Sequence, residues 1–172
     1  RNAVHRLGGL LDALDGYEHR EPVVDGCRYR EALQAVHVEG GVAGNVVPDR
    51  SMVRINHRYA PDRTGEEAEA HVRGFLAPHL EEGDEVNLVD HSLAAAPGLS
   101  HPVLRAVVER NGLKVGAKLG WTDVAFFSER GVPAVNLGPG ESTLAHTADE
   151  RVERSSLESC YAVLRDLVEN GV

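Results

Sequence analysis

The sequence predicts an α/β protein in two parts, an α+β unit over residues 1–92 and a piece of a second α/β unit over residues 93–172. In the first part, the hydrophobic pattern follows the order helix, strand, strand, helix, strand. In the second part, helices alternate with short apolar strands, which is typical of α/β proteins. Between them, residues 92–102 contain three alanines, two prolines and a glycine, and this break in periodicity predicts the domain boundary.

The first elements follow from side-chain spacing. Residues 1–14 are predicted to form a helix because Val4, Leu7, Leu11 and Leu14 fall on one stripe. A strand is predicted over residues 33–38, before the Gly40-Gly41 turn. Residues 51–59 then alternate as a half-buried strand does, with Val53, Ile55 and Tyr59 on the inner face. The outer, cationic face carries Arg54, Asn56 and Arg58.

The second helix has a clear start signal. Thr64 is predicted to cap it, with Glu67 three residues later as the capping-box partner. A further strand is predicted over residues 85–91. The resulting order is that of a split βαβ, ferredoxin-like two-layer unit without its first strand.

The second part is shorter and less complete. It is too short to be a whole α/β domain. Its expected elements are a helix over 103–110, a strand over 114–119, a helix opened by Thr122-Asp123, a strand over 133–137 and a helix over 153–168.

Composition excludes several classes of function. A net charge of −9 provides no basic stripe to neutralise nucleic-acid phosphates. No apolar run approaches the roughly 20 residues of a spanning helix, and no signal-peptide pattern opens the chain. Cys27 and Cys160 are interpreted as reduced thiols of a cytoplasmic protein, although the sequence leaves a disulfide between them open.

One histidine lies in a position suited to metal binding. The apolar strand over 133–137 leads into Gly138-Pro139-Gly140 and then to His146. Loops that leave buried strands are where α/β folds place ligands, and a neutral imidazole is a natural metal ligand. The other eight histidines are scattered without paired spacing and are interpreted as structural or exposed.

The chain contains four separated motifs, which are Gly44-Asn45-Val46-Val47-Pro48-Asp49, Asn56-His57-Arg58-Tyr59-Ala60-Pro61-Asp62-Arg63, Gly120-Trp121-Thr122-Asp123, and Gly138-Pro139-Gly140 with Ala145-His146-Thr147. Together they resemble the motifs of the two-metal amidohydrolases, the family that includes succinyl-diaminopimelate desuccinylases, acetylornithine deacetylase, aminoacylase and glutamate carboxypeptidase. The resemblance covers essentially the whole chain.

This resemblance implies that residues 1–92 are most of a lid, or dimerisation, domain and that residues 93–172 are the C-terminal part of a zinc-aminopeptidase-like catalytic domain. It implies two divalent metal ions, zinc or cobalt, and a homodimer formed through the lid. By similarity, His146 is the one metal ligand in the chain. The other ligands and the general base are expected upstream of Arg1, so no catalytic residue is assigned here and the chain alone is expected to be inactive.

The implied reaction is the hydrolysis of N-succinyl-LL-2,6-diaminopimelate in lysine and diaminopimelate biosynthesis. An acetylornithine deacetylase or another N-acyl amino acid deacylase is the alternative within the family. A hypothesis of another class also stands, namely a non-catalytic dimerisation or ligand-binding module.

The resemblance also assigns substrate-binding residues. Asn45 and Arg58 match lid positions that reach substrate carboxylate and amide groups, and a guanidinium binds a carboxylate bidentately. Gly120 and Thr122 match a loop that lines the substrate pocket. Each residue has a structural alternative: Asn45 stabilises a turn, Arg58 pairs with an acidic residue across the sheet, Gly120 makes a turn and Thr122 caps a helix. Phe126 departs from the family, where a basic side chain is expected.

Overall fold

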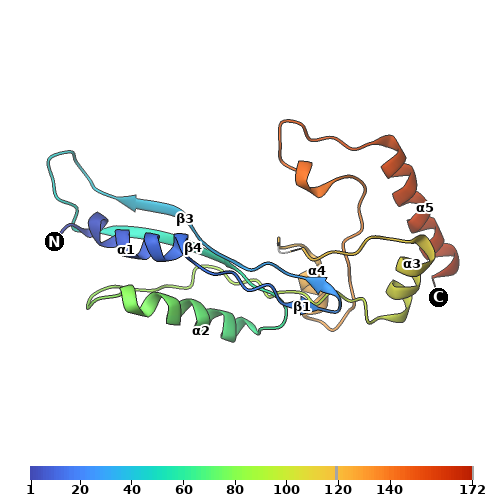
Figure 1. Ribbon diagram of the computed structural model, residues 1–172, viewed down its shortest axis with the longest axis horizontal. Helices are drawn as coiled ribbons and strands as arrows, with labels where there is room; N and C mark the ends of the chain where they lie inside the picture. The colour runs from blue at the N-terminus through green and yellow to red at the C-terminus, as the bar shows by residue number, and fades with distance from the viewer. Residues whose placement is uncertain (119, 172) are drawn as a thin grey trace.

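The computed structural model describes residues 1–118 and 120–171. The molecule is elongated, with α1, β3, β4 and α2 at one end and α3 and α5 at the other (Figure 1). The small β1–β2 hairpin and α4 lie between these ends. No helix in the described part of the chain has the length and apolar character needed to cross a membrane.

The N-terminal part is built on one long antiparallel strand pair. β3 (Ala32–Gly40) pairs with β4 (Ser51–Arg58), from Ala32 opposite Arg58 to Gly40 opposite Ser51, with an irregularity between Ala35 and His37. Half-buried and exposed residues alternate along β4, as the sequence predicted. The cationic outer face of this strand is therefore confirmed.

Two helices pack against the inner side of this strand pair. α1 (Ala3–Asp15) begins at Asn2, whose side chain accepts a hydrogen bond from His5 N. α2 (Gly65–Leu76) begins with the predicted capping box, and the 3-10 turn η1 (Ala77–His79) follows it. The buried cluster that joins both helices to β3 consists of Leu10, Leu14, Leu33 and Leu76.

The capping box of α2 has both of its hydrogen bonds. Glu67 N donates to Thr64 Oγ1 at 3.1 Å, and Thr64 N donates to Glu67 Oε2 at 2.8 Å. Two otherwise unpaired donors at the helix start are thereby satisfied.

The three later strands of the sequence prediction are wrong for this structure. Residues 85–91, 114–118 and 133–137 are not strands, and the described strands form only two two-stranded sheets. A strand requires a partner that supplies N–H and C=O groups at hydrogen-bonding distance. Val86 packs on the core, and its carbonyl accepts a hydrogen bond from the Arg73 side chain. Side-chain contacts, and not a strand partner, therefore hold this segment in place. Leu119, the end of the second predicted strand, lies outside the described residues.

The structure contains a short hairpin that was not predicted from the sequence. β1 (Val23–Val24) pairs with β2 (Cys27–Arg28) across Asp25 and Gly26, which have φ angles of 47° and 79°. An Asp-Gly pair between short strands is a strong hairpin signal, because both turn positions need positive φ.

The C-terminal part is helical. The helices predicted over 103–110 and 153–168 are confirmed as α3 (Pro102–Asn111) and α5 (Arg154–Asn170), and Asp166 of α5 accepts hydrogen bonds from Arg110 and Asn111 of α3. α4 (Val124–Ser128) has five residues, and the 3-10 turn η2 (Ser142–Leu144) precedes His146. The fold is thus mixed α/β with small sheets.

Candidate functional site

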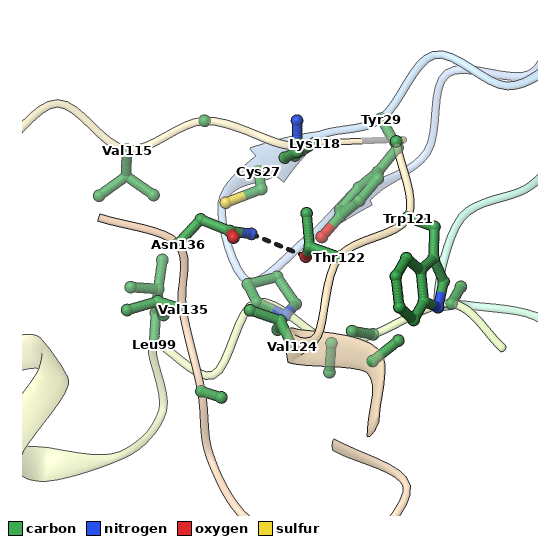
Figure 2. Close-up of a pocket in the computed structure, with 18 of the residues that line it drawn as sticks. Cys27, Tyr29, Leu99, Val115, Lys118, Trp121, Thr122, Val124, Val135 and Asn136 are labelled. Carbon is green, nitrogen blue, oxygen red and sulfur yellow. Dashed lines mark hydrogen bonds between the residues drawn. The ribbon is translucent and has the colours of Figure 1, made fainter. Parts of the chain in front are cut away.

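A cavity of about 920 Å³ lies where the two parts of the chain meet. The end of β4 forms part of its wall, and so do residues 90–97, which lead away from the N-terminal part. The loop that contains Gly120 and Thr122 and the segment 134–138 also line it, and Figure 2 shows part of this lining. The structure therefore brings three of the five predicted site residues, Arg58, Gly120 and Thr122, to one cavity.

Arg58 reaches the cavity because it is the last residue of β4 and lies on its exposed face. The acidic partner across the sheet that the structural alternative required is not found, since Arg58 lies opposite Ala32 and makes no ion pair within residues 1–118 and 120–171. The next residue, Tyr59, is held by contacts of its hydroxyl with His91 Nε2 at 3.1 Å and the Ser92 carbonyl at 3.3 Å. These contacts fix the end of β4 against residues 91–92.

Thr122 is not the helix cap that its structural alternative proposed. α4 starts after Asp123, and no side-chain capping bond is made there. Instead, Asn136 Nδ2 donates to Thr122 Oγ1 at 3.1 Å (Figure 2). This bond joins two walls of the cavity. The sequence analysis missed Asn136, although an amide side chain within the apolar run 133–137 is a signal that could have identified it.

The cavity is more basic than the rest of the chain. Its lining includes the basic residues Arg58, Lys114 and Lys118 but only one carboxylate, that of Asp90. The chain as a whole has 27 acidic and 18 basic residues. A basic, partly apolar cavity in an acidic protein favours an anionic ligand.

Asn45 does not lie at this cavity. It belongs to the exposed turn between β3 and β4, at the opposite end of the strand pair from Arg58. The seven steps from Ser51 to Arg58 correspond to roughly 23 Å at a strand rise of about 3.3 Å per residue. Within one copy of the chain, the two residues cannot contact the same small substrate.

His146 is also not among the residues that line the cavity. It is exposed, has a positive φ of 63°, and its N–H donates to Glu150 Oε2 at 3.1 Å. No group of three or more His, Cys, Asp or Glu side chains suited to a metal ion exists within residues 1–118 and 120–171. The described residues thus do not form a metal site by themselves, and one imidazole would need ligands from elsewhere.

A buried polar cluster supports the end of β4. Glu31 is fully buried and accepts hydrogen bonds from Arg20 Nη1 and from the N–H of Ala60, each at 3.1 Å. Arg63 Nη1 lies 3.8 Å from the other carboxylate oxygen. By holding Ala60, Glu31 fixes the backbone two residues beyond Arg58. No sequence signal identifies Glu31, since its partners come from distant positions.

His57 lines the cavity and lies within the electrostatic influence of Glu31 and Arg63 of this cluster. It points inward from β4, and its ring lies 5.5 Å from that of His71. Burial, which disfavours the charged imidazolium, lowers the pKa of His57 to about 4. The side chain is therefore neutral near pH 7.

Comparison with known proteins now identifies the family. The model of peptidase family M20/M25/M40 matches residues 9–170. The chain belongs to peptidase family M20/M25/M40. This membership agrees with the resemblance of the four motifs.

Members of the M20/M25/M40 family with similar sequences carry names of amide hydrolases. A Mycobacterium tuberculosis protein with the provisional name succinyl-diaminopimelate desuccinylase DapE is 48% identical over 166 residues, which cover 95% of this chain and 46% of the relative. A succinyl-diaminopimelate desuccinylase of Corynebacterium glutamicum is 38% identical over 95% of this chain and 45% of the relative. An N-acetyl-L-citrulline deacetylase of Xanthomonas campestris is 30% identical over 89% and 42%. The chain thus spans slightly less than half the length of these relatives.

Proposed function

We propose that this chain is part of a metal-dependent hydrolase that cleaves N-succinyl-LL-2,6-diaminopimelate to succinate and LL-diaminopimelate. The observation that carries the proposal is the basic cavity between the end of β4 and the Gly120–Thr122 loop. N-succinyl-diaminopimelate is a polyanion with several carboxylates, which suits this lining. The names of the relatives from M. tuberculosis and C. glutamicum support the same substrate.

Each site residue has a proposed role. Arg58 binds a substrate carboxylate through its guanidinium, and the absence of a protein ion partner within residues 1–118 and 120–171 leaves that group available. Gly120 allows the ligand to approach the backbone closely, and Thr122, fixed by Asn136, presents a hydroxyl. Asn45 lies too far from Arg58 to act on the same substrate molecule in one chain, so we propose that it reaches the site of a partner copy.

The metal requirement is proposed from family membership. The full enzyme would use two divalent ions, zinc or cobalt, whose chemistry activates water for amide hydrolysis. His146 is the one ligand proposed from this chain, and the remaining ligands and the general base are assigned to parts of the enzyme outside it. Because the described residues hold no complete metal site, we expect the chain by itself to be inactive.

The organisation of the enzyme is also a proposal. Residues 1–92 would form a ferredoxin-like lid that mediates a homodimer, and residues 93–172 would complete the catalytic domain. Cys27 and Cys160 are both free thiols, which suits a cytoplasmic enzyme.

A second candidate function is the deacylation of another N-acyl amino acid. The similarity to the N-acetyl-L-citrulline deacetylase and the apolar Phe126 both favour it. The non-catalytic module remains the alternative of another class. It predicts ligand binding or self-association without turnover.

One assay separates these candidates. The full-length enzyme that contains this chain is supplied with zinc or cobalt, and its hydrolysis of N-succinyl-LL-2,6-diaminopimelate and of N-acetylornithine is measured. We expect hydrolysis of the succinylated substrate, abolished by a chelator and restored by metal. Preference for N-acetylornithine would support the second candidate, and no turnover of either would support the module.

Replacing His146 by Ala in the same enzyme tests the metal ligand. We expect the metal content to fall from two ions to one and kcat to collapse, because one ion loses a side chain that binds it directly. Metal analysis by mass spectrometry and steady-state kinetics provide the measurement. His101→Ala, another exposed histidine, is the matched control. Two tightly bound ions with normal turnover would remove His146 from the site.

A further inference from the structure

The two lysines of the chain have an unusual location. Of the 18 basic residues other than histidine, 16 are arginines and only Lys114 and Lys118 are lysines. Both lysines line the 920 Å³ cavity. All ion pairs within residues 1–118 and 120–171 use Arg or His as the cation, so neither lysine makes a protein salt bridge there.

Lys118 lies beside the loop that contains Gly120 and Thr122. Its ammonium Nζ lies 3.6 Å from the position that a Cβ would occupy at Gly120, so the side chain folds over this glycine. Figure 2 shows Lys118 near Cys27 and Tyr29, at the edge of the same pocket as Thr122 and Asn136. The ammonium group is thus placed beside Gly120, in the loop that also contains Thr122.

The chemistry of an ammonium group suggests what Lys118 recognises. It is a flexible point charge that pairs with a carboxylate without requiring the planar geometry of an arginine. The cavity thus has cations on two walls, Arg58 from the end of β4 and Lys118 from the segment before the Gly120–Thr122 loop. An acyl amino acid with a dicarboxylic acyl group offers two carboxylates that can pair with them. An N-acetyl amino acid has no carboxylate on its acyl group, so only the carboxylate of its amino acid part could form such a pair, with Arg58.

We propose that Lys118 is a specificity-determining residue that pairs with the free carboxylate of a dicarboxylic acyl group, and so selects succinylated over acetylated substrates. This inference rests on the proposed function in taking the substrate to be an N-acyl amino acid. It assigns the choice of acyl group to a residue outside the four motifs of the resemblance.

Substitution at Lys118 in the full-length enzyme tests this assignment. Lys118→Met should lower kcat/KM for N-succinyl-diaminopimelate roughly tenfold, mainly through KM, and leave that for N-acetylornithine unchanged. Lys118→Arg should retain most of the preference because it keeps the charge. Arg105→Met, which removes one positive charge from an exposed position on α3 outside the cavity, is the control for net charge.

Lys114→Met removes the same charge from the same cavity. It therefore distinguishes a specific ion pair between Lys118 and the acyl carboxylate from a general electrostatic effect of positive charge in the cavity. An equal change in the succinyl-to-acetyl ratio with Lys114→Met, or no change with Lys118→Met, would overturn the assignment. A loss confined to Lys118→Met supports it.

Direct binding keeps this test independent of the proposed function. Calorimetric titration of wild type and Lys118→Met with succinate, and with acetate as the monocarboxylate comparison, needs no turnover. We expect wild type to bind succinate more tightly than acetate, and Lys118→Met to lose that difference. Equal binding of succinate by both proteins would overturn the role of Lys118, whereas failure of wild type to hydrolyse N-succinyl-diaminopimelate contradicts the proposed function alone.

Discussion

Arg58 and Arg54 lie on the same exposed face of β4, but only Arg58 lines the cavity. This difference makes them a matched pair. Arg58→Ala should reduce kcat/KM of the full-length enzyme without changing its metal content. The reduction should correspond to a loss of about 1.5–3 kcal/mol of transition-state stabilisation, the usual contribution of a hydrogen bond to a charged group. Arg54→Ala should leave both unchanged. Steady-state kinetics and metal analysis provide the readouts, and equal losses in the two variants would count against a specific role for Arg58.

His57 predicts a pH dependence of stability. Its pKa is lowered from 6.5 in the unfolded chain to about 4 by burial, so the folded state disfavours the protonated ring. The pKa of His71 is also lowered, again chiefly by burial. The stability that the neutral His57 ring contributes is fully present above pH 6.5 and is lost as pH falls from about 6.5 towards 4. Nearby charges of Glu31, Arg63 and Arg20 are part of this environment.

We therefore expect Tm to fall between pH 7 and pH 5. His57→Phe keeps an aromatic ring but removes its titration, so its Tm should fall less over the same interval. Thermal unfolding at the two pH values measures this. His79 lies at the end of η1, and His79→Phe is the control. Its Tm should fall as much as that of wild type. Identical falls in wild type and His57→Phe would exclude His57 as the source.

At the scale of elements, the features predicted correctly from the sequence are those that depend on residues close together in the chain. The Thr64–Glu67 capping box and the alternation along β4 depend on neighbours within a few residues, and both are present. Strand 85–91 depends on a partner far away in sequence, and periodicity does not reveal whether that partner is available. For the same reason, the cavity could be expected from the motifs, whereas the separation of Asn45 from Arg58 required the register of β3 and β4.

The capping box should make a measurable contribution to stability. Thr64→Ala removes the acceptor for Glu67 N and should destabilise the fold by about 1 kcal/mol. Chemical denaturation at pH 7 measures the change in free energy of unfolding. Thr143→Ala, in the exposed turn η2, is the control and should stay within about 0.5 kcal/mol of wild type. Comparable losses in both variants would contradict a specific capping contribution.

The whole molecule leaves much apolar surface in contact with solvent. Residues 34–40 of β3 are exposed, including Val36 and Val38, and β3 pairs with no described strand except β4. α5 also carries exposed apolar side chains, among them Val168, which is 84% exposed. A strand with one unpaired edge and exposed β-branched residues is a site for edge-to-edge pairing with another chain.

We expect this chain by itself to self-associate, and we expect β3 rather than α5 to drive the association. A backbone edge supplies directional hydrogen bonds in addition to apolar contact, whereas an exposed helix face supplies apolar contact alone. Val38→Lys places a charge on the strand and should shift the sedimentation profile towards the monomer. Val168→Lys makes the same chemical change on α5 and should leave the profile as in wild type. A monodisperse wild-type monomer with a cooperative thermal transition would contradict self-association, and an effect of Val168→Lys alone would place the contact on α5.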